Sequence, residues 1–233
     1  MATKKKKKRG VWSFLRKILL IVLLLNVGYI VVLKWVYPPI TLTMLGALRD
    51  GYSLKRDYVA WNEINKYAKL AVIASEDQLF ATHNGFDVRA IQKAIEYNLD
   101  QEHKKVKGAS TISQQTAKNV FLWQGRDWLR KGLEVYHTFM IEWIWGKQRI
   151  LELYLNVAEM GKGVFGIEAA SRHYFKKSAR ELNKTEAAWI AAILPNPKRY
   201  SIGKGSVVAR KHSWILRQMQ HLDKDPGIQA LLK

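Results

Sequence analysis

The chain of 233 residues contains no cysteine, and this absence removes several kinds of chemistry. Without thiols there is no disulfide, no thiolate nucleophile and no cysteine-ligated zinc site. The six histidines show no metal-ligand spacing, so no metal site is predicted from the residue pattern. The lack of cysteine leaves the cellular compartment open.

Acidic residues are also scarce, with 19 Asp and Glu against 39 Lys and Arg, which gives a net charge of +20. Such an excess predicts a polyanionic partner, which could be nucleic acid, anionic lipid or phosphate. Hydrophobic residues make up 48% of the chain and aromatic residues 11%, enough for a folded core. The length allows one domain plus an anchor.

Long alternating strand patterns and internal repeats are missing as well, and the helical period dominates from about Tyr67. Capping residues mark the expected starts of later helices: Asp87, Ser110 with the capping box Thr111-x-x-Gln114, Asp127, Ser178, Thr185 and Ser206. The helix after Asp87 carries Val88, Ile91, Ile95 and Leu99 on one face. The helix capped by Asp127 is expected to run to about Ala158, and Pro195 should stop the last apolar helix. The sequence therefore predicts a mainly α domain.

The N-terminus combines a basic block with a long apolar run. Residues 4–9 are five lysines and an arginine, and residues 18–37 are almost entirely apolar. About 20 residues at 1.5 Å each match the ~30 Å hydrocarbon thickness of a bilayer. A cleaved signal peptide is the alternative, but no small-x-small site follows the run, which ends in Lys-Trp-Val-Tyr-Pro-Pro. We therefore predict a basic cytoplasmic tail (1–17), a transmembrane anchor (18–37), a connector near the membrane (38–66) and a globular domain (67–233) across the membrane.

Two familiar motifs occur in contexts that argue against them. Residues 161–166 match the dinucleotide fingerprint G-x-G-x-x-G, but that motif needs a preceding strand and the segment before it is helical. These glycines are expected to shape a turn between helices. Residues 201–204 match the S-x-x-K of penicillin-binding transpeptidases, but no Lys-Thr-Gly follows.

Residues 76–87 concentrate two acids, an imidazole, a glycine and a further acid. Glu76 and Asp77 alone could be a solvated helix end, but this density of polar groups favours a site. Gly85 would permit the turn that brings Asp87 back. His83 is more typical of a hydrogen-bond partner that fixes a loop than of a metal ligand.

Two further groups of polar residues follow along the chain. Ser110, Thr111, Gln114 and Gln115 could be ordinary capping or could line a polar groove for sugars. Lys118, Arg126, Arg130 and Lys131 could be a solvated basic face or a clamp for a pyrophosphate. The residue pattern by itself leaves both alternatives open.

Taken together, these segments resemble the peptidoglycan glycosyltransferases, in particular the monofunctional, membrane-anchored biosynthetic members of Gram-negative bacteria. The first family motif, Glu-Asp-x-x-Phe-x-x-His-x-Gly-x-Asp, matches residues 76–87. The second matches residues 108–115, with Ser113 in place of the usual threonine, which keeps the hydroxyl. The third, Arg-Lys-x-x-Glu, matches residues 130–134. The fourth and fifth resemble residues 150–175 and the segment from Leu194 through the helix with Arg210, so the resemblance covers residues 72–219.

The resemblance implies a lysozyme-like, mainly α glycosyltransferase domain behind a single N-terminal transmembrane helix. It implies that lipid II is polymerised through β-1,4 linkages, with inversion and release of undecaprenyl pyrophosphate. Glu76 would be the general base, since a carboxylate with an ordinary pKa near 4.3 is ionised at neutral pH. Glu134 would hold a cation, assist at the leaving group or bind a metal.

The resemblance also assigns the remaining residues, cofactors and partners. The implied residues for binding substrate and pyrophosphate are Lys93, Ser110, Thr111, Gln114, Gln115, Lys118, Arg126, Arg130 and Lys131. The implied motif-shaping residues are Asp77, Phe80, His83, Gly85 and Asp87. A divalent cation such as Mg²⁺ or Mn²⁺ is implied, together with partners among cell wall synthases and division proteins. The implied location is the bacterial inner membrane, with the catalytic domain in the periplasm and no nucleic acid partner.

Two other classes of function are compatible with single features of the chain. A lytic, lysozyme-like enzyme would need a carboxylic acid with a raised pKa and no pyrophosphate clamp. A membrane-tethered nucleic-acid-binding module is suggested by charge alone. It would require the basic domain in the cytoplasm, against the orientation that the N-terminal lysines predict.

Overall fold

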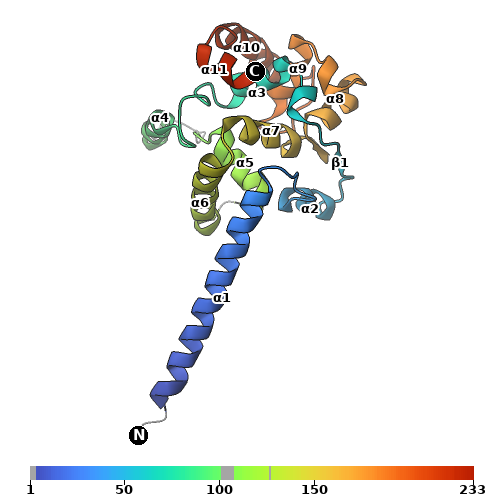
Figure 1. Cartoon of the computed structure of the whole chain (residues 1–233). Coiled ribbons are helices and arrows are strands. Elements are labelled where there is room, and N and C mark those ends of the chain that lie inside the picture. The colour runs from blue at the N-terminus through green and yellow to red at the C-terminus, as the bar shows by residue number, and fades with distance from the viewer. Residues whose placement is uncertain (1–3, 101–107, 126) are drawn as a thin grey trace. The chain divides into compact units, whose positions relative to one another are not determined.

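The computed structural model describes residues 4–100, 108–125 and 127–233 (Figure 1). The chain divides into two compact units, residues 1–37 and 38–233, which are described separately. In the first unit, α1 extends over Lys4–Val32. Within the described residues, one helical stretch, Val11–Val32, is long and apolar enough to cross a membrane. The α-helix thus ends before Tyr37, the last residue of the predicted span.

Helices make up most of the second unit, which confirms the mainly α expectation. The α-helices are α2 (Leu42–Arg49), α3 (Lys66–Glu76), α4 (Val88–Leu99), α5 (Ile112–Phe121), α6 (Trp128–Ile144), α7 (Lys147–Val157), α8 (Ile167–Phe175), α9 (Lys184–Ile193), α10 (Ser206–Leu222) and α11 (Pro226–Leu232). Two short 3₁₀ turns cover Trp61–Glu63 and Ala179–Glu181.

Three very short strands form a small sheet beside α8. They are β1 (Lys55–Arg56), β2 (Glu159–Gly161) and β3 (Val164–Phe165), in the order β1-β3-β2. Strand β3 is parallel to β1 and antiparallel to β2. Of the G-x-G-x-x-G glycines, Gly161 and Gly163 lie in this hairpin and Gly166 is the N-cap residue of α8. The segment follows helix α7, so it is not a dinucleotide-binding turn. The expected turn between helices is therefore a β-hairpin.

Local capping signals predicted several helix starts correctly. Thr111 forms the capping box with Gln114 at the start of α5. Asp87 accepts the Ala90 N–H at the start of α4, and Asp127 caps α6 in the same way. These contacts span three residues, so the sequence alone specifies them.

Other expectations about the helices were wrong. The long helix after Asp127 is divided between α6 and α7 by Gly146, whose φ of +79° lies in the left-handed region. Helix α9 is capped by Asn183, so Thr185 lies inside its first turn. Helix α4 itself begins after Asp87 as expected, and Val88, Ile95 and Leu99 on its apolar face are exposed.

The packing of α3 positions the candidate site. Residues 68–74 of this helix are buried throughout, and α3 packs against α9 and α10. Helix α5 packs in turn against α6 and α7. The end of α3 and the start of α5 are joined by a hydrogen bond from the Ile112 N–H to Asp77 Oδ2 (3.0 Å). This contact brings Glu76, the last residue of α3, beside the polar face of α5.

Candidate active site

Glu76 ends helix α3 with a side chain that is only 12% exposed, and three elements contribute its polar contacts. Gln115 on α5 donates from Nε2 to Glu76 Oε2 (3.0 Å). Lys211 on α10 lies 3.4 Å from Oε1, and the Ser75 hydroxyl lies 2.7 Å from the same oxygen. These contacts orient the carboxylate in a largely desolvated position.

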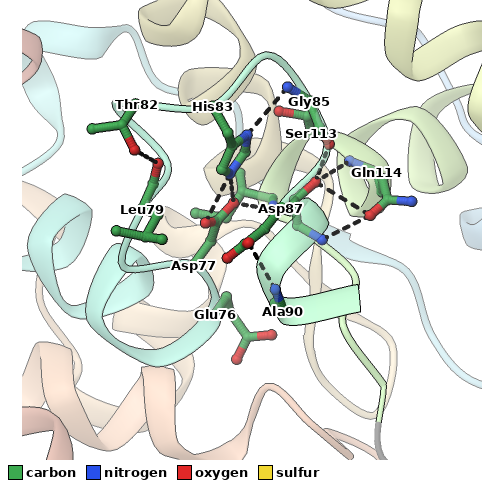
Figure 2. Close-up of polar contacts among 12 residues, drawn as sticks. Glu76, Asp77, Leu79, Thr82, His83, Gly85, Asp87, Ala90, Ser113 and Gln114 are labelled. Carbon is green, nitrogen blue, oxygen red and sulfur yellow. Dashed lines mark hydrogen bonds and ion pairs between the residues drawn. The ribbon is translucent and has the colours of Figure 1, made fainter. Parts of the chain in front are cut away.

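The loop after Glu76 is organised around Asp77 and His83. Gly85 N–H donates to His83 Nδ1 (3.1 Å), so the imidazole proton is on Nε2 and is donated to Asp77 at 3.0 Å. The Thr111 hydroxyl donates to the Gly85 carbonyl oxygen (2.6 Å) and ties the loop to α5. Figure 2 shows the Glu76 carboxylate pointing away from this network, so Asp77 organises the loop and Glu76 takes no part in it.

Gly85 has a structural reason to be glycine. Its φ is +89°, and a Cβ there would lie 2.9 Å from Thr138 Cγ2 and 3.0 Å from Glu142 Cγ. Any side chain would therefore strain the backbone and crowd α6. Phe80 is fully buried and meets the His83 ring edge-on at 6.3 Å. The residues predicted to shape the first motif thus form one connected loop.

Glu134 on α6 is buried and paired with two cations of its own helix. Arg130 Nη1 lies 2.6 Å from Oε2, and Lys131 Nζ lies 2.5 Å from Oε1. Arg130 is also buried, and its Nε has no hydrogen-bond partner within the described residues. Each carboxylate oxygen of Glu134 thus has a cationic partner on the same helix.

Lys118 on α5 connects the two carboxylate centres. Burial lowers its pKa, and the nearby Arg130 and Lys131 act in the same direction, whereas Glu134 and Glu76 oppose the shift. Lys118 thus lies within electrostatic range of both carboxylates. The sequence could not establish that Glu76 and Glu134 lie in one region of the domain. In the structure both carboxylates interact electrostatically with the same side chain, Lys118.

Glu76 and its hydrogen-bond partner Gln115 line two different cavities. The first, of about 230 Å³, is lined by Glu76, Asp77 and Asp87 from one side and by residues 108–111 from the other. The second, of about 420 Å³, is lined by Gln115, Lys118 and Tyr154 among others. Tyr154 donates its hydroxyl to Gln115 Oε1 (3.3 Å). Glu76 therefore lines one cavity and is hydrogen-bonded to a residue that lines the other.

The predicted polar residues divide between capping and lining the cavities. Ser110 lines the first cavity and Gln115 the second. Thr111 and Gln114 are buried, and the Gln114 side chain accepts the Thr111 N–H, so Gln114 is used in the helix cap. Lys93 is exposed on α4 and lines neither cavity. Arg126 lies outside the described residues.

Sequence reasoning missed two residues that the structure brings to Glu76. Lys211 follows Arg210 in the fifth motif, but nothing local indicates which of the two cations turns inward. Tyr154 lies in the fourth motif, and both burial and the Glu76 carboxylate raise its pKa well above the usual value. A tyrosine within an apolar helix is more often a core residue, so its pattern carried no signal.

The described residues contain few side chains that could bind a metal together. Within residues 4–100, 108–125 and 127–233, no group of three His, Asp or Glu side chains could hold an ion. Both oxygens of Glu134 are already paired with cations. The described side chains therefore do not form a protein-only site for the divalent cation that the resemblance implies.

A helical domain with a largely buried carboxylate that lines a polar cavity, and with cations held on neighbouring helices, is typical of an enzyme for polar substrates that carry an anionic group. The family model described as Transglycosylase matches residues 43–220. The chain therefore belongs to the transglycosylase family, which confirms the resemblance drawn from its motifs.

Curated relatives agree with this assignment, and each is named Biosynthetic peptidoglycan transglycosylase. The protein of Haemophilus influenzae is 56% identical over 172 residues, which cover 73% of this chain and 70% of the relative. The protein of Pseudomonas aeruginosa is 47% identical over 230 residues, covering 96% and 98%. The protein of Yersinia pseudotuberculosis is 54% identical over 183 residues, covering 76% and 75%.

Proposed function

We propose that the protein is a peptidoglycan glycosyltransferase that joins lipid II molecules into linear glycan strands for the cell wall. Membership of the transglycosylase family and the names of its relatives support this function. The observation that carries the proposal within the site is the Glu76 carboxylate, which lines a polar cavity and is oriented by Gln115 and Lys211.

In this reaction Glu76 accepts the proton of the N-acetylglucosamine 4-hydroxyl of the acceptor. That oxygen attacks C1 of the N-acetylmuramic acid in the donor and forms the β-1,4 bond with inversion. The bond from C1 to the pyrophosphate oxygen breaks, and undecaprenyl pyrophosphate leaves with the electron pair. General base catalysis contributes about 10²–10⁴-fold, so positioning and electrostatic stabilisation supply the rest.

Lys118 is the cation best placed to stabilise the departing pyrophosphate. It lines the larger cavity and is close enough to Glu76 for the two charges to interact. Its partial desolvation strengthens its attraction for an anion, because fewer waters compete for the charge. Arg130 and Lys131 are proposed to add to the positive field, with Glu134 holding both in place.

The assignments of Lys93 and Arg126 remain proposals that rest on the resemblance. A divalent cation is likewise proposed on the resemblance alone, and it would supply positive charge to neutralise the departing pyrophosphate. Cell wall synthases and division proteins are proposed as partners on the same ground.

A lytic enzyme is the competing function, and the setting of Glu76 argues against it. Lysis needs a protonated carboxylic acid in an apolar pocket. Here a lysine lies 3.4 Å from the carboxylate, which suits a group that works in its charged form. Lys118, the partly buried cation that lines the larger cavity, would also have no anion to stabilise during the cleavage of a neutral glycosidic bond.

Replacement of Glu76 by glutamine tests the proposal. Glu76→Gln keeps the size of the side chain, but it replaces one accepting oxygen by a donating amide and cannot take up the proton. The full-length variant should fold and bind lipid II or moenomycin, yet make no polymer, while an exposed control, Glu96→Gln, should polymerise normally. Solubilisation of purified cell wall by the wild type, without polymer from lipid II, would establish the lytic function instead.

We also propose that the protein is a single-pass protein of the bacterial inner membrane, with a cytoplasmic N-terminus and a periplasmic catalytic domain. The apolar helix Val11–Val32 and the preceding lysines support this orientation. Alkaline phosphatase fused to the C-terminus should be active. An inactive phosphatase with an active cytoplasmic reporter at the same point would reverse the topology.

A further inference from the structure

The larger cavity is lined by a second lysine that the mechanism above does not use. Lys118 lines this cavity from helix α5, and Lys198 lines it from the turn that follows helix α9. Backbone hydrogen bonds shape this turn. The Asn196 N–H donates to the Ile193 carbonyl oxygen (3.1 Å), and the Tyr200 N–H donates to the Asn196 carbonyl oxygen (2.8 Å). Two elements that are far apart in the sequence thus bring a lysine to the same cavity.

The ammonium group of Lys198 is paired with Asp50, the C-cap residue of helix α2. Its Nζ lies 3.1 Å from Asp50 Oδ2, across 148 residues of sequence, and 5.2 Å from the centre of the Tyr52 ring. The hydrogen bond from Lys198 and its charge lower the pKa of Asp50, so this carboxylate is ionised at neutral pH. Lys198 therefore has an anionic partner from the protein itself.

This ion pair is weak enough to be exchanged for another anion. The two side chains are 39% and 41% exposed, and exposed ion pairs contribute little because water and salt screen them. The flexible stem of a lysine allows its ammonium group to turn without a change in the backbone. Burial raises the pKa of Glu159, which also lines the cavity, and Lys198 opposes this shift. Lys198 is thus within electrostatic range of a group in the cavity.

We propose that Lys198 binds the pyrophosphate of the lipid-linked substrate together with Lys118, and that Asp50 holds its ammonium group while the cavity is empty. On binding, Lys198 Nζ exchanges the Asp50 carboxylate for a phosphate oxygen. A pyrophosphate carries more negative charge than a carboxylate, and Lys118 adds to the attraction, so the exchange favours the substrate. Asp50 competes with the substrate, and this competition promotes release of the pyrophosphate after each transfer. The inference rests on the proposed function, since it assigns a further residue to the same cavity.

Two substitutions with opposite effects test this exchange. The assay is equilibrium binding of lipid II to the full-length chain, with Glu76→Gln in every sample so that no substrate is consumed. Lys198→Met should weaken binding about three- to tenfold, because a charge-assisted contact is lost. Asp50→Asn should tighten binding about two- to fivefold, because the competing charge is removed. Lys204→Met and Asp57→Asn change the charge equally at exposed positions that do not line the cavity, and they should leave the affinity unchanged.

The double variant shows whether Asp50 acts through Lys198. With Lys198→Met in place, Asp50→Asn should have no further effect on the affinity. A gain in affinity that persists in the double variant would mean that Asp50 repels the anion directly, and this would overturn the exchange. Unchanged affinity in both single variants would overturn it as well.

A second measurement needs neither lipid II nor turnover. Acetic anhydride labels exposed lysines of the full-length wild-type protein, and mass spectrometry quantifies the label at each site. Millimolar inorganic pyrophosphate should reduce labelling of Lys198 several-fold and leave the exposed Lys204 and Lys224 unchanged. Labelling of Lys198 that pyrophosphate does not change would overturn the proposal. Protection of Lys198 in a protein that makes no polymer from lipid II would refute the proposed function but leave the pyrophosphate site intact.

Discussion

Lys211 provides the sharpest test of how the proposed base is held. Its Nζ lies 3.4 Å from Glu76 Oε1, and the two side chains are 24% and 12% exposed. At that distance the Coulomb energy is about 5 kcal/mol with an effective dielectric constant of about 20, and about 1 kcal/mol in bulk water. The partial exposure places the true value between these limits. We therefore expect Lys211→Met to slow turnover about 10- to 100-fold.

The assay is lipid II polymerisation by the full-length protein in vesicles, with kcat and KM determined separately. If Lys211 acts through Glu76, kcat falls while KM changes by less than about twofold. Lys211→Arg keeps the charge and should recover most of the rate, and the exposed Arg217→Met on the same helix should behave as wild type. A normal kcat for Lys211→Met would refute the reasoning, and a rise in KM alone would make Lys211 a substrate-binding residue.

Three further predictions concern other parts of the domain. Burial lowers the pKa of Lys69 from 10.5 to about 8. Below pH 8 the lysine is charged in both the folded and the unfolded state, so burying the charge lowers the free energy of unfolding. This penalty decreases between pH 8 and pH 10.5, where the folded state already carries the neutral amine. Lys69→Met should therefore be more stable than wild type by about 1–3 kcal/mol at pH 7, with the difference vanishing near pH 10.5 in denaturant titrations. Gly166→Ala should lower the melting temperature sharply, because its Cβ would lie 2.6 Å from the Asn156 carbonyl oxygen at a φ of +83°. Its control, Gly132→Ala in α6, has open space around the new Cβ and should stabilise by about 0.5–1 kcal/mol. Lys118→Met should reduce turnover about tenfold or more with unchanged circular dichroism, and normal turnover would remove the clamp from the mechanism.

Local chemistry explains why several elements could be predicted. The caps at Asp87, Thr111 and Asp127 each act on a backbone N–H three residues ahead, and the residues that make them are adjacent in sequence. The break at Gly146 was missed because the apolar spacing continues across it, and only its backbone conformation separates α6 from α7. The strands were missed because two or three residues are too few to show alternation, and β1 pairs with a strand more than a hundred residues away.

The sequence by itself determined the anchor candidate, the helical class, the family and the first-motif carboxylate, since all depend on composition or on short ordered motifs. Tertiary structure alone decided which polar groups reach Glu76. Lys211 is 135 residues from Glu76 along the chain, and Tyr154 meets Gln115 across 39 residues. Both contacts exist because α3 packs on α10 and α5 packs on α7. Helix periodicity shows which face of a helix is apolar, but it does not specify which other helix that face will contact. The packing of α10 on α3 is what places Lys211 beside the Glu76 carboxylate.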